Sequence, residues 1–330
     1  MQSEECPRLL ADIGGTHSRF AWQTGANAPP TEVATYLCAD NASLLLAMRR
    51  YLQEHGKPVP PWCAIGIANP ITGDQVQMTN HHWSFSIAGL QQELGFERLV
   101  VINDFTALAL SLPALTAADL HQIGHGAPRP GGPLAVLGAG TGLGVSGLFV
   151  TGPGEYFPIT GEGGHVTLAA TDERENAVIE RLRLRFGHAS AERALSGPGL
   201  VNLYEAACAL TGHAAEALRP AEVIARARIG EDACCVTALD LFFSFFGGVA
   251  GDLALTLGAT GGVFLGGGLA PRLIPELESS SFRQRFESKG RFRGYLCNIP
   301  TYVIHASVSP AFTGAARALD CQKASGRNVL

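Results

Sequence analysis

Residues 9–16 read LLADIGGT, an apolar run that ends in an acid and a glycine-rich turn. The run Leu9–Ile13 predicts a buried strand, because all its residues except Asp12 are apolar and it is only a few residues long. The stretch Ser18–Gln23 after the turn predicts a second strand that returns beside the first. This part of the chain therefore begins with a strand-turn-strand unit whose turn is rich in glycine.

A second unit of the same kind occurs later in the chain. The stretch Leu134–Leu137 predicts a strand, Gly138–Gly142 a turn, and Gly144–Val150 the returning strand. When the first GGT is aligned with the second AGT, apolar strands superpose on both sides of each turn, about 125 residues apart. Two such units suggest two related halves that face a common ligand. Only the first carries an acid, Asp12, as expected if one turn also handles a metal ion.

The remaining sequence alternates apolar runs and helical periodicity, typical of an α/β protein. Asn41 is the expected N-cap of a helix with one apolar face formed by Leu44, Leu45, Met48 and Leu52. Further elements are expected as follows: strands over Trp62–Ala68, Arg98–Asn103, Gly262–Leu265 and Tyr302–Ala306, a helix from Ser86 to Gly95, a helix from Phe105, mostly helical chain from Glu173 to Leu257, and a closing helix over Ser309–Leu319.

The pattern shifts around Pro113–Ala118, where we place a domain boundary. The expected small α/β domain comprises residues 1–113 plus 306–330, because we expect the closing helix to pack back onto the first strands. The expected large α/β domain, with helical insertions, comprises residues 114–305.

Composition indicates a globular protein. Of 330 residues, 46% are hydrophobic and 16% are charged, and the net charge is −5, which offers no basic field for nucleic acid or an anionic membrane surface. The eight cysteines form no CxxC pair and no signal peptide opens the chain, so we expect reduced thiols, no zinc site and a cytoplasmic protein. The stretch Leu241–Ala270 carries only Asp252 as a charge, but its glycines favour a buried helix followed by a buried strand over a membrane span.

The glycine-rich turns are suited to phosphate. Backbone N–H groups and a threonine hydroxyl bind anionic oxygens, and Asp12 would hold Mg²⁺ against the phosphates. No GxxxxGK[ST] and no HRD or DFG motif is present, which excludes P-loop and protein-kinase nucleotide sites. Each turn alone reads equally well as an ordinary hairpin. The two together, with Asp12 and the third cluster Gly266–Gly268, favour phosphate binding.

A second set of polar residues is suited to a sugar: Asn103, Asp104, Glu162, His165 and Glu192. Carboxylates and amides can bridge neighbouring hydroxyls, and the glycines around Glu162 and His165 let the backbone approach a ligand closely. Taken singly, His165 reads as a buried histidine, Glu192 as a solvated helix residue and Asp104 as a helix N-cap. Their combination with the phosphate turns favours a sugar-kinase site.

The order of motifs along the chain resembles that of the bacterial glucokinase family, which belongs to the actin-like hexokinase group. The resemblance covers essentially the whole chain. The motifs that carry it are ADIGGT (11–16), NPITGD (69–74), MTNH (78–81), VINDFT (101–106), GAGTGLG (138–144), GEGGH (161–165) and AERALSGPG (191–199).

The resemblance implies a two-domain actin-like (ribonuclease H-like) sugar kinase fold with a cleft between the domains, usually as a homodimer. It implies Asp104 as the catalytic base and Asn103, Asp104, Glu162, His165 and Glu192 as glucose ligands. It implies ATP and Mg²⁺ as cofactors, with Asp12 toward the metal and the following residues toward ATP: Ala11, Asp12, Ile13, Gly14, Gly15, Thr16, Gly140, Thr141, Gly142, Gly267 and Gly268.

The function expected is therefore ATP-dependent phosphorylation of D-glucose to glucose 6-phosphate. Two alternatives remain at this stage: a kinase of another hexose or hexosamine, and a catalytically inert sugar-binding sensor. A sensor would be expected to lack Asp104 or the phosphate turns, and a transcriptional regulator would need a DNA-binding module, of which we see no sign before Leu9.

Overall fold

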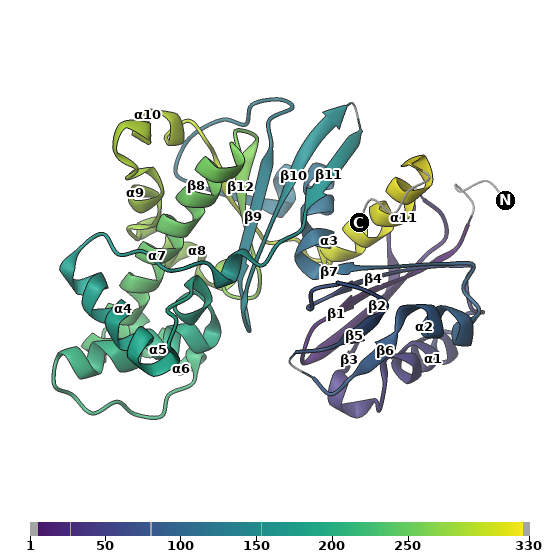
Figure 1. Cartoon of the computed structure of the whole chain (residues 1–330), viewed down its shortest axis with the longest axis horizontal. Helices are drawn as coiled ribbons and strands as arrows, with labels where there is room; N and C mark the ends of the chain where they lie inside the picture. Colours follow the sequence, from purple (N-terminus) through teal and green to yellow (C-terminus); the bar gives the residue numbers. More distant parts are fainter. Residues whose placement is uncertain (1–5, 27, 80, 153, 326–330) are drawn as a thin grey trace. The chain divides into compact units, whose positions relative to one another are not determined.

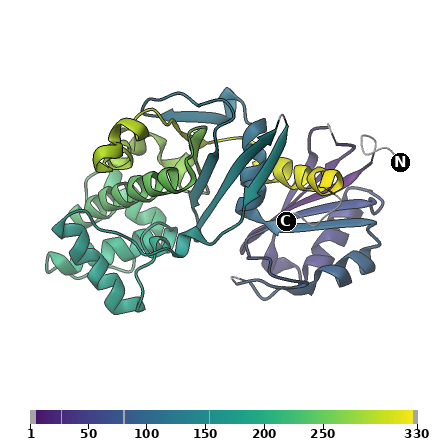
Figure 2. The same cartoon turned by 45° about the horizontal axis from the view of Figure 1, so that its top comes forward.

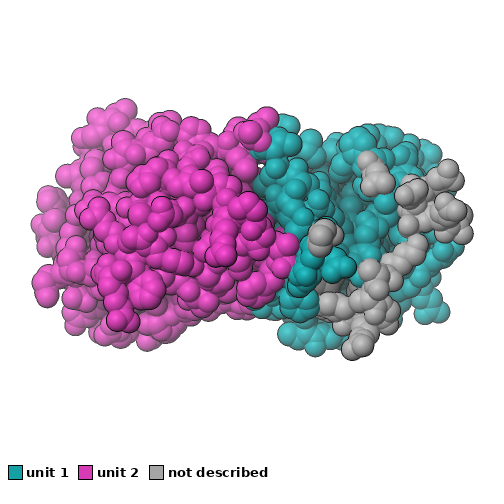
Figure 3. Space-filling view, turned by 90° about the horizontal axis from the view of Figure 1, so that it is seen from above, with its two compact units in different colours: residues 1–116, 151–160, 306–330 teal, residues 117–150, 161–305 magenta. Residues whose placement is uncertain are grey.

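The computed structural model describes residues 6–26, 28–79, 81–152 and 154–325, with side chains up to 321 (Figure 1). Asn80, in the expected motif 78–81, lies outside these residues. The chain separates into two compact units (Figure 3). Unit 1 comprises Met1–Thr116, Thr151–Thr160 and Ala306–Leu330, and unit 2 comprises Ala117–Val150 and Gly161–His305.

Unit 1 is built on a five-stranded sheet in the order β3-β2-β1-β4-β7. Strands β1, β2 and β3 pair antiparallel, whereas β1, β4 and β7 run parallel. The strands are β1 (Arg8–Ile13), β2 (His17–Gln23), β3 (Thr31–Leu37), β4 (Trp62–Ile67) and β7 (Arg98–Asn103), and a separate ribbon pairs β5 (Gln75–Gln77) with β6 (Ser84–Ser86). The predicted strand-turn-strand unit at the start of the chain is confirmed.

Helices cover both faces of this sheet, as Figure 1 shows. They are α1 (Leu44–Glu54), α2 (Ile87–Leu94), α3 (Asp104–Ser111) and α11 (Pro310–Ser325). Successive residues of β1 point to opposite faces of the sheet, and each face is covered by a pair of helices. Leu9, Ala11 and Ile13 are buried in one core cluster with residues of α1 and α2. Leu10, between them, is also buried, on the face where α3 and α11 pack on β4.

The start of α1 differs from the sequence prediction, which made Asn41 the N-cap. The cap is Ser43, whose side chain accepts a hydrogen bond from Leu46 N. Asn41 instead ends the preceding 3-10 turn, and its backbone oxygen accepts the indole N–H of Trp83 at 2.9 Å. The prediction was wrong because an asparagine and a serine two residues apart are both good caps, and the tertiary contact with Trp83 decides between them.

The last helix is attached to the first strand by a buried arginine. Arg8, fully buried, donates two hydrogen bonds to the Asp320 carboxylate at 2.7 and 3.1 Å, and its guanidinium lies over the Trp62 ring. Nearer the start of α11, a Cβ built on Gly314 would overlap the backbone oxygen of Ala107 in α3. Helix α11 therefore packs as closely as a glycine allows.

The second sheet has six strands in the order β11-β10-β9-β12-β13-β8, and all of it except β11 and the end of β10 lies in unit 2. Its strands are β8 (Leu120–Ile123), β9 (Leu134–Ala139), β10 (Leu143–Gly152), β11 (Glu155–Ile159), β12 (Gly262–Gly266) and β13 (Thr301–Ile304). Strands β9 and β10 form an antiparallel hairpin, and β9, β12 and β13 run parallel. This is the order of unit 1 with one strand added, so the repeat predicted from the two turns is present in the topology.

The segment 151–160 holds β11 and contacts α3, and for that reason it belongs to unit 1, whereas we expected it within a continuous second domain. The difference has a physical basis in the long hairpin β10–β11. Strand β11 pairs with β10 in the second sheet and also contacts α3.

The core of unit 2 is the long helix α7 (Ala233–Leu257), which Figure 2 shows beside the sheet. It is long and apolar enough to cross a membrane, but 61% of its most apolar window is buried against protein. It packs on α5, α6 and α9 and is followed by the buried strand β12, as predicted. The helices around it are α4 (Glu173–Phe186), α5 (Gly197–Leu210), α6 (Pro220–Arg228), α8 (Ile274–Ser279), α9 (Phe282–Glu287) and α10 (Arg293–Leu296).

Candidate active site

In unit 1 the three parallel strands end side by side. The register pairs Ile13 of β1 with Ile67 of β4, and Ile67 with Asn103 of β7. The glycine-rich turn after Ile13 and the carboxylate of Asp104 after Asn103 therefore leave the sheet at the same edge. Ligands of open α/β sheets bind at the carboxyl ends of strands, so this edge is the candidate site of the unit.

The first turn is closed by its own backbone. Gly14 N donates to His17 O at 2.9 Å, and Cys38 N donates to Thr16 O at 2.9 Å. Gly15 is partly exposed and Thr16 is exposed, as a phosphate-binding turn requires. Ala11 and Ile13 have fully buried side chains, so their contribution to the predicted ATP site is to hold the turn against the core.

Asp12 is 9% exposed and is held on one oxygen. Its Oδ2 accepts hydrogen bonds from Arg19 Nη1 at 3.1 Å and Ser309 Oγ at 2.9 Å. Mg²⁺ in phosphoryl-transfer sites is commonly bound through one or two carboxylates plus substrate phosphates, and one oriented carboxylate fits that pattern. Sequence reasoning missed Arg19 and Ser309. Ser309 lies 297 positions from Asp12, and no local signal links the two.

Asn103 and Asp104 lie at the start of α3. Asn103 Oδ1 is the N-cap and accepts hydrogen bonds from Phe105 N at 2.9 Å and Thr106 N at 3.2 Å. Asp104 Oδ1 also accepts from Phe105 N at 2.9 Å. Both residues are half-buried. The helix start therefore orients both polar side chains at the strand end.

In unit 2 two glycine-rich loops run side by side after β9 and β12. Gly138 is paired with Gly266, and a Cβ on either Gly138 or Gly267 would overlap the neighbouring backbone. Leu269 N donates to Ala139 O at 3.1 Å and keeps the loops together. Gly140, Thr141, Gly142, Gly267 and Gly268, all expected at the nucleotide, are thus neighbours on one edge of the second sheet, and none is fully buried.

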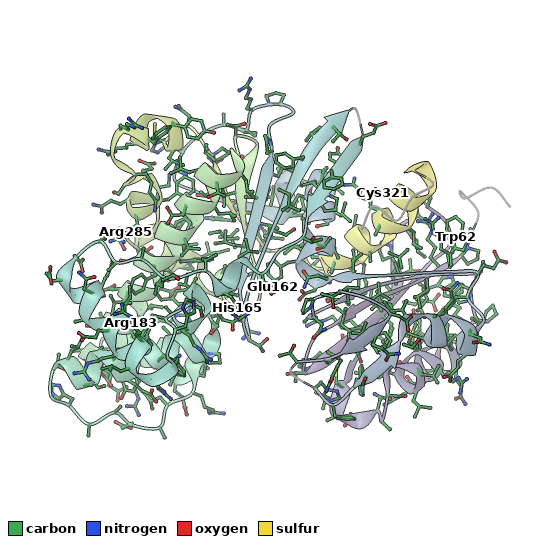
Figure 4. The ribbon with its side chains drawn as sticks, viewed as in Figure 1. Trp62, Glu162, His165, Arg183, Arg285 and Cys321 are labelled. Carbon is green, nitrogen blue, oxygen red and sulfur yellow. The ribbon has the colours of Figure 1, made fainter. Side chains whose placement is uncertain are left out.

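Glu162 and His165 flank two glycines that form a 3-10 turn, Gly163–His165, and Figure 4 shows both side chains on this segment. His165 N donates to Glu162 O at 3.0 Å. Both side chains are exposed, so the ordinary interpretation of His165 as a buried core histidine does not hold. Two exposed polar side chains on a tight glycine turn are well placed to bind a polar ligand.

Glu192 lies on the 3-10 turn Ala191–Arg193, just before α5. Its side chain contacts the end of the glycine-rich turn that joins β9 to β10. Its Oε2 accepts a hydrogen bond from Leu143 N at 2.9 Å. The start of α5 is tied to that turn as well, because Gly197 N donates to Gly140 O at 2.8 Å. Glu192 is therefore a half-buried carboxylate held by the second turn, rather than a solvated helix residue.

The predicted residues thus form two groups. Unit 1 brings Asp12, the turn 14–16, Asn103 and Asp104 to one sheet edge, and unit 2 brings the glycine loops, Glu162, His165 and Glu192 together. Two sheets of the same strand order, each with a glycine-rich hairpin turn, and an oriented carboxylate at a strand end define the class of actin-like sugar kinases.

Comparison with known proteins agrees with this class. The family model for glucokinase matches residues 9–322. The chain is 55% identical over 319 residues to a glucokinase of Aromatoleum aromaticum, covering 96% of both chains. It is 50% identical over 316 residues to a glucokinase of Chromobacterium violaceum, covering 95% of this chain and 89% of the other. The crystal structure of a glucokinase from an Antarctic psychrotroph superposes with a TM-score of 0.84 at 36% identity, covering 94% and 98% of the two chains.

This chain therefore belongs to the glucokinase family. Its reaction is the ATP-dependent phosphorylation of glucose, and the alternatives of another sugar substrate or an inert sensor are not favoured.

Proposed function

We propose that Asp104 is the general base that accepts the proton of the glucose 6-hydroxyl while this oxygen attacks the γ-phosphorus of ATP. The observation that supports this most directly is the shared edge of β1, β4 and β7, which puts an oriented carboxylate at the strand ends beside the Gly14–Thr16 turn. Phosphoryl transfer relies mainly on positioning and charge neutralisation. A base is needed only to remove the proton as the O–P bond forms.

The sugar ligands in this proposal are Asn103, Asp104, Glu162, His165 and Glu192. A sugar presents several hydroxyls, each of which can donate one hydrogen bond and accept others. Carboxylates accept from these hydroxyls, while the Asn103 amide and the His165 ring can also donate. The half-buried groups among them, Asn103, Asp104 and Glu192, reject a sugar whose hydroxyl leaves one of them unpaired.

The nucleotide in this proposal is bound by backbone N–H groups of the two glycine-rich turns. Mg²⁺ would be held by Asp12 together with phosphate oxygens, and it supplies charge neutralisation of the phosphates when bound. Arg19 and Ser309 keep the Asp12 carboxylate in one orientation through Oδ2. We further propose a cytoplasmic enzyme that works as a homodimer, which light scattering on the purified protein would test as twice the mass of 34.7 kDa.

The substitution Asp104→Asn tests the base. It keeps the size and the hydrogen-bond acceptor of the side chain but removes its basicity, so we expect glucose binding to persist and turnover to fall by roughly 10²–10⁴-fold. Asp240→Asn, at an exposed position of α7, is the matched control and should leave turnover unchanged. A variant at Asp104 that phosphorylates glucose at the parental rate would show that another group accepts the proton.

The preference for glucose can be measured directly. A coupled assay with ATP compares kcat/KM for glucose, for mannose and glucosamine, which differ from it at C2, and for the ketose fructose. We expect glucose to be preferred, because a site that pairs each hydroxyl penalises a missing or inverted one. A higher kcat/KM for another hexose would reassign the physiological substrate.

A further inference from the structure

The Glu192 carboxylate occupies space that exists only because residue 142 is a glycine. A Cβ built on Gly142 would overlap Oε2 of Glu192 and would lie 3.3 Å from its Cδ. The same Oε2 accepts the hydrogen bond from Leu143 N, one residue further on. Two neighbouring residues thus determine where this carboxylate lies. Gly142 leaves room for it because it has no Cβ, and Leu143 donates its backbone N–H to it.

The backbones on both sides of this contact are fixed. Ser196 Oγ donates to Glu192 O at 2.9 Å, and Gly197 N donates to Gly140 O at 2.8 Å. A Cβ on Gly164 would overlap the backbone oxygen of Leu143, so the segment that carries Glu162 and His165 also packs against the turn. A change at the turn is therefore transmitted to the Glu192 side chain, which is the most easily displaced part of this cluster.

We propose that Gly142 is a positioning residue for the sugar, acting through Glu192, although it lies in the turn expected to bind the nucleotide. Leu143 N–H holds Oε2, which leaves Oε1 to accept from a sugar hydroxyl; the described residues make no hydrogen bond to Oε1. Because one turn serves both ligands, occupancy by nucleotide changes the affinity for glucose and the reverse, by the same factor. This inference rests on the proposed role of Glu192 as a glucose ligand.

The substitution Gly142→Ala tests whether Gly142 positions Glu192 for the sugar. The added methyl meets the flexible end of a side chain rather than backbone, and the φ angle at Gly142 is not in the left-handed region, so the variant should fold with a melting temperature close to that of the parent. The displaced carboxylate loses a charge-assisted hydrogen bond. We expect glucose binding, measured by calorimetry without nucleotide, to weaken by roughly 10- to 100-fold.

Gly294→Ala in α10, outside the proposed site, is the matched glycine-to-alanine control, because its new Cβ would meet nothing within 4 Å. It should leave glucose affinity unchanged. The double variant Gly142→Ala/Glu192→Ala should bind glucose no more weakly than Glu192→Ala alone, since the methyl acts only through that carboxylate. If the losses of glucose affinity caused by Gly142→Ala and Glu192→Ala added up fully in the double variant, the proposal would be overturned. It would also be overturned if Gly142→Ala lost as much ATP affinity as glucose affinity.

Glu192→Ala tests the proposed sugar site separately from the role of Gly142. If Glu192→Ala binds glucose as tightly as the parent, Glu192 is not a glucose ligand and the proposed site is wrong. If Glu192→Ala weakens glucose binding and Gly142→Ala does not, only the positioning role of Gly142 is wrong.

Discussion

Asn103, the last residue of β7, and Asp104, the first residue of α3, are both held by the start of this helix. Asn103 caps α3 through two backbone N–H groups, and Asp104 shares one of them, Phe105 N. An N-cap is worth about 0.5–2 kcal/mol of stability. The cap also fixes the first turn of the helix, and the proposed base is the first residue of that turn.

At Asn103 the cap can be separated from sugar binding by two substitutions. Asn103→Ala should lower the free energy of unfolding by about 1 kcal/mol, because Thr106 N loses its acceptor and Phe105 N keeps only Asp104 Oδ1, and it should also weaken glucose binding. Asn103→Asp keeps a capping oxygen and should restore stability, but it cannot donate to a sugar oxygen and should still bind glucose weakly. Urea unfolding and calorimetry measure the two effects, and full recovery of binding by aspartate would argue against an amide donor.

At the scale of elements, α3 is held between a strand and a helix. Ala107 lies between two glycines: a Cβ on Gly66 of β4 would come within 3.2 Å of the Ala107 side chain, and one on Gly314 of α11 would overlap the Ala107 backbone oxygen. The position of the helix that begins with Asp104 therefore depends on small residues that belong to other elements. Close packing of this kind tolerates little added volume.

Gly314→Ala should consequently destabilise the protein. The methyl has no room unless α11 or α3 shifts, and overpacking of this type costs about 1–3 kcal/mol. We expect a lower urea midpoint and, because α3 carries Asp104, a lower kcat. Gly294→Ala in α10, where a Cβ meets nothing within 4 Å, is the control and should be neutral or slightly stabilising. Equal stability of the two variants would contradict the close contact.

The start of α2 predicts a pH dependence. Asp74 accepts hydrogen bonds from Ser86 Oγ at 2.6 Å and Ala88 N at 2.8 Å, and these bonds lower the pKa of its carboxyl below the usual value. Because the pKa of Asp74 is lower in the folded than in the unfolded protein, its ionised carboxylate stabilises the fold. This stabilisation is complete at a pH above the unfolded pKa, near 3.9, and is lost as the pH falls through the folded pKa. Asp74→Asn should therefore lower the urea midpoint at pH 7 but by much less at pH 3. A midpoint difference independent of pH would exclude this linkage.

At the scale of the whole molecule, the chain contains two copies of one sheet topology with different additions. Unit 1 is completed by the C-terminal helix through the Arg8–Asp320 pair, and unit 2 is filled by the buried helix α7. The proposed glucose ligands are divided between the units, with Asn103 and Asp104 in the first and Glu162, His165 and Glu192 in the second.

Glucose should therefore stabilise the protein through ligands of both units. A ligand at 100 times its Kd adds about 2.7 kcal/mol to the free energy of unfolding. We expect saturating glucose to raise the melting temperature, and Asn103→Ala and Glu162→Gln each to reduce that rise, in thermal scans with an open-chain polyol as the osmolyte control. If Glu162→Gln kept the full rise, glucose would be held without this residue of unit 2.

Local sequence signals were sufficient to predict most of the secondary structure, whereas the residues of the site stay a prediction. Apolar runs and turn residues act over a few neighbours, so the helix from Ser86 to Gly95, the two glycine turns and the strands β1, β2, β4, β7, β9, β10, β12 and β13 could be predicted locally. Strands β3, β5, β6, β8 and β11 were not predicted. The matching order of motifs also indicated the family. Where two local signals competed, as at Asn41 and Ser43, the prediction failed, because a contact with a distant tryptophan made the choice.

Contacts between residues far apart in the sequence could not be predicted from local signals. The contacts of Asp12 with Ser309, of Glu192 with Gly142 and Leu143, and of Ala107 with Gly314 join residues that no periodicity or motif connects. Such contacts depend on sheet register and close packing, which are properties of the whole chain and not of any window of sequence. The strand-turn-strand unit at residues 9–16 was readable from its own residues, whereas the serine that orients its acid was supplied from the other end of the chain.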